Sequence, residues 1–203
     1  MSLQFLITAL VVVIAPGTGV IYTLAIGLGQ GRRAALMAAL GCTLGIVPAL
    51  LAAVLGLATL LHMSALLFQV VKFAGVAYLL WLAWQALRSD GALSLRPETR
   101  AEPGLAIARR GALINILNPK LSIFFLAFLP QFVSPAAASP VLEMLAMSAV
   151  FMAMTFAVFV VYGQFSGLMR DRVLSSERAI AWMRRSVALA FAGFGLKLAL
   201  SSR

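Results

Sequence analysis

The sequence contains few of the residues from which metal sites, disulfides and catalytic triads are built. It has one cysteine, Cys42, one histidine, His62, and only six acidic residues among 203. A single cysteine excludes an intramolecular disulfide, and so few cysteines and histidines cannot supply the ligand sets of transition-metal clusters. We therefore expect no metal, no cofactor and no enzymatic activity.

Charged residues are also scarce, at 11%, whereas hydrophobic residues make up 63% of the chain. Soluble domains carry about 25% charged residues. The mean hydropathy of +1.02 agrees with an integral membrane protein, and the length suits one domain. The net charge of +10 does not indicate nucleic-acid binding, because the basic residues lie between apolar runs rather than on one face.

Six apolar runs are candidates for membrane spans, each of which needs about 20 residues as a helix. They cover Leu3–Leu28, Ala34–Leu61, Ala65–Leu87, Gly111–Val133, Val141–Met169 and Ser186–Leu200. The last run is short and contains Lys197. The first lacks the basic start of a signal peptide, so we expect it to be retained as a span.

The links between these runs alternate in charge. Residues 29–33 hold two arginines, 88–110 hold five and 170–185 hold five, whereas the links around His62 and at 134–140 hold none. Loops on the cytoplasmic side of a membrane are enriched in Lys and Arg. The pattern predicts that the three basic links are cytoplasmic and that both termini lie outside.

Two of the six runs contain residues that break helices. Pro16-Gly17 interrupts the first run, and Asn118-Pro119 interrupts the fourth. Lipid tolerates broken backbone only where protein or a water-filled cavity satisfies it. Breaks at matching places in the two halves of a membrane protein indicate a transport site.

The long link 88–110 divides the single domain 1–203 into the halves 1–87 and 111–203. Each half holds three spans, and an odd number inserts the second half upside down relative to the first. We therefore expect an all-α integral membrane fold. It has six transmembrane helices in two inverted three-helix halves, with broken helices one and four.

Both breaks predict the start of a new half-helix near the bilayer midplane. Asn is a favoured N-cap and Pro is favoured at the first helical position, as in Asn118-Pro119. Thr18 can cap the half-helix that follows Pro16-Gly17. The positive dipole ends of both half-helices would then converge.

Lysines at this depth add to the positive charge. Lys120 lies nine residues, or about 13 Å, into its run, and Lys72 is comparably deep. The one carboxylate within a run, Glu143, lies close to the outer end of the fifth. A ligand carboxylate would neutralise this charge, while free carbonyls and Asn115 would hold an ammonium group, so the site suits an amino acid. The structural alternatives are a simple kink at Pro16 and a Lys72 that snorkels.

The predicted site has two sets of residues. Those expected to bind substrate are Pro16, Gly17, Thr18, Gly19, Lys72, Asn115, Asn118, Pro119 and Lys120. Gly41, Gly45 and Ala49, at intervals of four, predict a face for close helix packing, with the substrate pathway as the alternative.

Taken together, these residues resemble the LysE/RhtB family of bacterial amino-acid exporters over nearly the whole chain. The resemblance rests on Pro16-Gly17, Gly29-Gln30-Gly31-Arg32-Arg33, Gly41 and Gly45, Lys72 with Gly75-Val76-Ala77-Tyr78-Leu79-Leu80, and Gly111, Asn115, Asn118-Pro119-Lys120 and Pro130-Gln131-Phe132. It implies a multi-pass secondary transporter of the bacterial inner membrane. Such a protein exports an amino acid or close derivative by alternating access, with protons as the coupling ion.

The chain also departs from the family pattern. Thr18-Gly19 stand where many relatives have Pro followed by Asp or Asn, and Ile46–Ala49 is apolar where many have Asp or His. An apolar site with fewer carboxylates favours a neutral or hydrophobic amino acid. Two other classes stay open at this point: a transporter of ions or metals, and a membrane enzyme or non-transporting scaffold. A homodimer is also left open.

Overall fold

A computed structural model of the protein describes residues 2–14, 17–61, 65–88, 97–118, 121, 125, 129–133, 139–168 and 176–200. The elements within these ranges are helices, and no strand occurs among them. Pro16, Pro119 and Lys120 lie outside the described residues. Lys72 belongs to a described helix, but its side chain lies outside the described part of the chain.

The first half of the chain forms five helices separated by short breaks. They are α1 (Leu3–Ile14), α2 (Thr18–Gln30), α3 (Arg32–Leu44), α4 (Val47–Leu61) and α5 (Ala65–Arg88). The axes of α1 and α2 differ by 52°, so the first run is broken as the sequence predicts. Gly31 turns the chain from α2 into α3 with a φ of 86°, a backbone conformation that glycine adopts without steric cost.

The second half contains α6 (Gly104–Ile116), the 3₁₀ helix η1 (Leu129–Phe132), α8 (Pro140–Gln164), α9 (Ser166–Leu168) and α10 (Glu177–Leu200). Two helices begin before the apolar runs that they contain. α6 begins at Gly104, ahead of the run at Gly111, and α10 begins at Glu177, ahead of the run at Ser186. Both helices include the arginines that precede these runs, because helical structure does not have to begin where apolar sequence begins.

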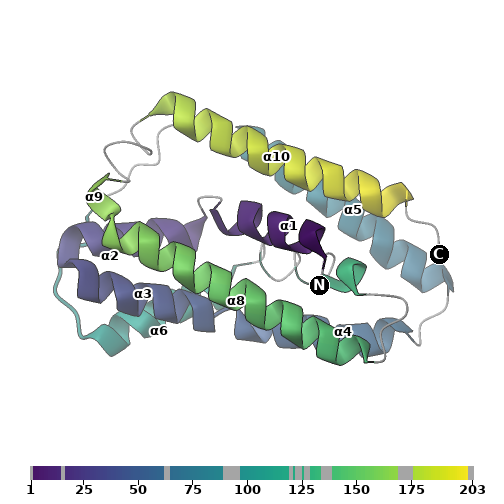
Figure 1. Ribbon diagram of the computed structural model, residues 1–203, viewed down its shortest axis with the longest axis horizontal. Coiled ribbons are helices and arrows are strands. Elements are labelled where there is room, and N and C mark those ends of the chain that lie inside the picture. The colour runs from purple at the N-terminus through teal and green to yellow at the C-terminus, as the bar shows by residue number, and fades with distance from the viewer. Residues whose placement is uncertain are drawn as a thin grey trace.

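Two described helices are long and apolar enough to cross a membrane. They are Arg32–Gly56, which joins α3 to the start of α4, and α8; the bent pair of α1 and α2 would make a third span. Figure 1 shows α5 and α10 lying along each other on one side of α1, and α8 lying on the other side with α2 and α3. The arrangement as six spans in two inverted halves stays a prediction.

α3 and α6 touch at small residues. A Cβ added to Gly41 would overlap the backbone of Ala108, and one added to Gly45 would overlap Ala112. Both contacts advance by four residues along each helix, so α3 and α6 run parallel. Ala49, the third member of this face, is buried in the main hydrophobic core. Such close approach stabilises membrane helices through van der Waals packing, because the hydrophobic effect does not drive helices together within lipid.

We expect Gly41→Ala to lower the free energy of unfolding by about 1–3 kcal/mol, because the new methyl group must displace the α6 backbone. Thermal unfolding in detergent micelles measures the change. Gly193→Ala in α10 is the matched control, since nothing described lies within 4 Å of a Cβ there. Equal melting temperatures for Gly41→Ala and the wild type would contradict the packing account.

α8 runs antiparallel to α3. A Cβ added to Gly163 would lie 2.7 Å from Cβ of Ala35, and Gln164 Nε2 donates to Arg32 O over 3.2 Å. The α2–α3 turn, the segment before α6 and the end of α8 therefore gather at one end of the bundle. We call residues 29–33, 97–103 and 164–168 the arginine end. The charge pattern predicts this grouping.

Candidate functional site

The two interruptions of the chain meet in the structure. Asn118 follows the end of α6, and its Nδ2 donates to Oγ1 of Thr18, the first residue of α2, over 3.2 Å. These residues are 100 positions apart in the sequence. The contact joins the two breaks that the sequence identified separately.

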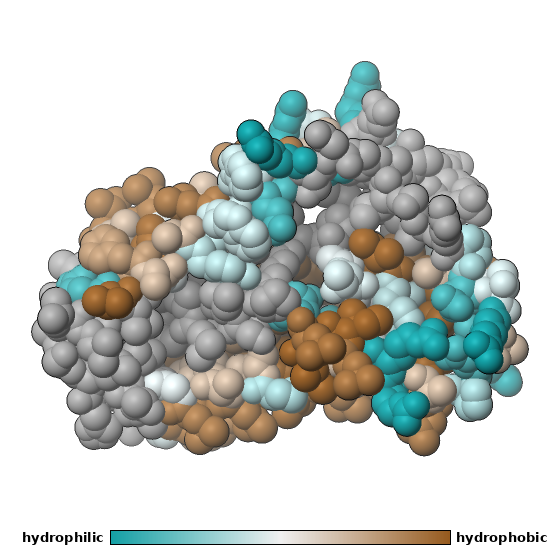
Figure 2. Space-filling view, turned by 180° about the vertical axis from the view of Figure 1, so that it is seen from behind, coloured by the Kyte–Doolittle hydropathy of each residue, from teal (hydrophilic) through white to brown (hydrophobic). Residues whose placement is uncertain are grey.

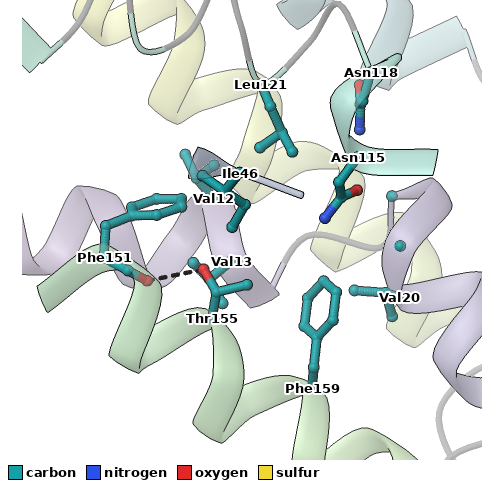
Figure 3. Close-up of a pocket in the computed structure, with 12 residues that line it drawn as sticks. Val12, Val13, Val20, Ile46, Asn115, Asn118, Leu121, Phe151, Thr155 and Phe159 are labelled. Carbon is teal, nitrogen blue, oxygen red and sulfur yellow. Dashed lines mark hydrogen bonds between the residues drawn. The ribbon is translucent and has the colours of Figure 1, made fainter. Parts of the chain in front are cut away.

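A small cavity lies beside this contact (Figure 3). The centre of a water molecule can occupy about 40 Å³ of it. It is lined by Val12, Val13, Gly17, Gly19, Val20, Ile46, Asn115, Asn118, Leu121, Phe151, Thr155 and Phe159. The described part of this lining is mostly apolar and contains no charged side chain, so it suits an apolar group flanked by a few polar contacts.

α2 presents its N-terminus to the cavity. Its N-cap is Gly17, which makes no side-chain capping bond, and Thr18 is already helical. The prediction that Thr18 caps α2 is therefore wrong, because the extended backbone of Gly17 begins the helix one residue earlier. The first ladder bond runs from Ile21 N to Gly17 O, so the N–H groups of Gly19 and Val20 are not used in it. Free donors at a helix N-terminus favour an anion such as a carboxylate.

Asn115 is buried, and its amide nitrogen is used to hold α6 against α3. At the α3–α4 junction Ile46 N donates to Thr43 O rather than to Cys42 O. Asn115 Nδ2 donates to Cys42 O instead, over 2.6 Å. Its Oδ1 points to the start of α2, 3.0 Å from the position of a Cβ on Gly19. Oδ1 of Asn115 can therefore offer the cavity an acceptor, and the bond to Cys42 O uses one of the two N–H groups on Nδ2.

α8 supplies a wall of the cavity that sequence reasoning missed. Phe151, Thr155 and Phe159 recur at intervals of four and line the cavity from one face of α8. Thr155 Oγ1 donates to Phe151 O over 2.8 Å (dashed in Figure 3), which leaves its lone pairs as acceptors. The spacing of these three residues can be seen in the sequence. The sequence does not show that this face points inward, because a membrane helix is apolar on all sides.

A second contact from α8 reaches the first break. Tyr162 OH donates to Ile14 O, the last carbonyl of α1, over 2.8 Å. The carbonyls at a helix C-terminus lack partners within the helix. Tyr162 satisfies one of them and ties α8 to the point where α1 ends.

Within the arginine end, residues 97–103 lie against the C-terminal part of α2, and we call this segment the strap. Glu98 N donates to Ala25 O in α2 over 3.1 Å. The backbone of Glu98 also touches Gly29, where a Cβ would overlap it. The glycine therefore lets the strap lie directly on the end of α2.

The strap also carries a charged pair. Glu102 N donates to Gln30 Oε1 over 3.2 Å, and Glu102 Oε1 binds Arg110 Nη2 of α6 over 2.6 Å. Glu102 Oε2 and Gln30 Nε2 are nevertheless buried without a hydrogen-bond partner. Buried polar atoms without partners cost free energy, so the strap is held on α2 less stably than full pairing would hold it.

The structure brings together five of the nine predicted substrate-binding residues. Gly17, Thr18, Gly19, Asn115 and Asn118 meet at or beside the cavity. Pro16, Pro119, Lys120 and the side chain of Lys72 lie outside the described part. The expected pair of converging half-helix starts is therefore described on the α2 side alone.

Comparison with known proteins identifies the family. The sequence profile described as LysE type translocator matches residues 10–202. The chain belongs to the LysE type translocator family. It is therefore a membrane transporter of the family that the sequence motifs resemble. No solved structure matches the chain.

Three relatives in this family show how similarity is distributed. The leucine efflux protein of Klebsiella pneumoniae is 28% identical over 97% of this chain and 93% of its own length. The homoserine/homoserine lactone efflux protein of Salmonella typhimurium is 33% identical over 64% of each chain. An uncharacterized membrane protein of Vibrio cholerae is 35% identical over 66% of this chain and 65% of its own length.

Proposed function

We propose that this LysE-type protein exports a neutral, apolar amino acid or a close derivative across the bacterial inner membrane. The bond between Asn118 and Thr18 carries the proposal, because it closes two broken helices around an apolar cavity. The relatives named for leucine efflux and for homoserine efflux support this substrate class.

The substrate would bind with its charged groups at the helix ends. Its carboxylate would accept from the N–H groups of Gly19 and Val20, and its ammonium group would donate to Asn115 Oδ1. Pro16, Pro119, Lys72 and Lys120 belong to the same proposed site. The side chain would lie towards the apolar wall formed with Phe151.

Transport would proceed by alternating access, with the strap as the gate at the arginine end. The positive-inside rule places this end in the cytoplasm and both termini outside. Substrate would enter when the strap leaves Ala25 and Gln30. The unpartnered atoms of Gln30 and Glu102 support such a motion, because water would satisfy them in the open state.

Proton coupling follows the family resemblance and is part of the proposal. An imposed proton gradient across inverted membrane vesicles should drive amino-acid uptake, because export from the cell is uptake into such vesicles. A protonophore should remove the driving force. Equal uptake with and without the gradient would contradict proton coupling but not export itself.

Substrate class is tested with a panel of labelled amino acids in the same vesicles. Leucine and homoserine should accumulate, and lysine should not, because the described lining has no acidic side chain for a second ammonium group. Vesicles without the protein serve as the control. Accumulation of lysine at the rate of leucine would contradict a neutral apolar site.

A further inference from the structure

A second hollow lies on the outer surface of the bundle, between α3 and α6. It is a groove of about 530 Å³, within the size range of about 300–1,000 Å³ that is typical of small-molecule sites. Its lining combines Gly41 and Leu44 of α3 with Pro103, Leu105, Ala106, Ala108, Arg109 and Ala112. Among the described residues that line the groove, Arg109 is the charged one.

The surroundings of the groove are those of a surface in contact with lipid. Leu44 is 52% exposed, Leu105 is 78% exposed, and Leu113 is 49% exposed. α3 belongs to Arg32–Gly56, which is long and apolar enough to span a membrane. Figure 2 shows hydrophobic residues directly beside hydrophilic ones over the end of the molecule where α6 begins.

The packing of α6 on α3 places Arg109 further along the bundle than the cytoplasmic link 88–110, to which the charge pattern assigned it. Since Gly41 meets Ala108 and the two helices run parallel, Arg109 lies level with about Cys42. Cys42 follows Arg32 by ten residues, or about 15 Å along α3. Side chains on a helix point towards its N-terminus, so Arg109 reaches back along the groove towards Pro103.

Arg109 differs from its neighbour Arg110 in its charged contacts. Arg110 binds Glu102 over 2.6 Å. The ion pairs of the described residues include none with Arg109, which is exposed. A guanidinium cannot shed its charge, and a charge facing lipid hydrocarbon is costly unless an anion accompanies it.

We propose that the groove binds one anionic phospholipid, with its phosphate on Arg109 and an acyl chain between Leu44 and Ala112. Arginine recognises phosphate through two parallel hydrogen bonds, and basic pockets between membrane helices hold anionic headgroups. The bound lipid would cover the parallel contact of α3 and α6, next to the strap. The proposal depends on placement of this surface in the membrane and not on the substrate class proposed above.

Native mass spectrometry of the purified full-length protein in detergent tests the site with added phosphatidylglycerol or phosphatidylcholine. Phosphatidylglycerol should give one retained adduct per chain, and phosphatidylcholine should not. Arg109→Gln should lower phosphatidylglycerol occupancy at least about tenfold, because it removes the bidentate phosphate contact. Leu44→Trp should lower it too, because the larger side chain fills the groove and leaves Arg109 in place.

Arg178→Gln is the matched control, since it removes one exposed arginine at the start of α10, which does not line the groove, and should keep the adduct. Unchanged occupancy in Arg109→Gln would overturn the proposal, as would equal binding of phosphatidylcholine. Displacement of the lipid by millimolar inorganic phosphate would show a phosphate site without a chain site. A dimer that both groove variants dissociate would show that this face binds a second copy instead.

Discussion

Asn118→Ala is expected to reduce export by up to about tenfold while the protein still folds and inserts. The Asn118 amide joins the end of α6 to the start of α2 beside the cavity. Loss of a hydrogen bond between neutral groups costs about 0.5–1.5 kcal/mol, and about 1.4 kcal/mol corresponds to a factor of ten. Initial rates of leucine uptake into inverted vesicles, normalised to the amount of inserted protein, measure the effect.

A double-mutant cycle with Thr18→Val shows whether the two residues act as a pair. If their contact matters for transport, the double variant should lose little more than the worse of the two single variants. Thr43→Val is the matched control, because its hydroxyl bonds Ala39 O within its own helix and does not line the cavity. Independent, fully additive losses at Thr18 and Asn118 would show that their contact is not part of the site.

The breaks in the helices were predictable because their causes are local. Proline lacks the N–H that a helix needs, and glycine costs it stability, so Pro16-Gly17 and Asn118-Pro119 mark interruptions without knowledge of any neighbour. The structure has α1 end at Ile14 and α6 end at Ile116, close to these motifs. The arginine-bearing links were expected for a similar reason, since charge avoids the bilayer wherever it lies in the chain, but α6 begins within the link 88–110 and the cytoplasmic side stays a prediction.

The inner surface of the site was not predictable because it depends on contacts between distant segments. Asn115 Nδ2 donates to Cys42 O, 73 positions away in the sequence. That carbonyl can accept this bond because Ile46 N, at the α3–α4 junction, donates to Thr43 O instead. The α8 wall was missed because hydropathy distinguishes residues that face water from residues that do not. It does not distinguish the protein-facing side of a membrane helix from the lipid-facing side, since both are apolar. Glu102 was overlooked for the opposite reason: its partner Arg110 was assigned to a loop, whereas α6 already includes it.

The structure adds carbonyl groups to the electrostatic account of the site. Besides the positive start of α2, the C-terminus of α6 reaches the second break, and carbonyl groups point outward there. The second helix start, expected after Pro119, lies outside the described residues. The start of α2 and the end of α6 therefore offer partial charges of both signs, which suits the two charges of a zwitterion.

Locking the strap onto α2 is expected to abolish export reversibly. Gln30 and Glu102 touch through a hydrogen bond of 3.2 Å, so cysteines at both positions should be joined by a short, reducible thiol cross-linker. The buried Cys42 is replaced by alanine so that no other thiol reacts. If the strap must leave the arginine end for substrate to enter, the cross-linked protein should bind no substrate from the cytoplasmic side and should recover on reduction.

A cross-link within the strap is the control that distinguishes loss of gating from damage caused by the cross-linking reaction. Cysteines at Arg100 and Glu102 both lie in the strap, so joining them leaves its contacts with Ala25 and Gly29 free to open. This variant should keep transporting after treatment, whereas the Gln30–Glu102 pair should not. Full export by the Gln30–Glu102 cross-linked protein would mean that substrate does not pass the strap, and the gate would then have to lie elsewhere. Loss of export in the Gln30–Glu102 cross-linked protein alone would identify undocking of residues 97–103 as the step that opens the cavity to the cytoplasm, because that cross-link fixes the strap to α2.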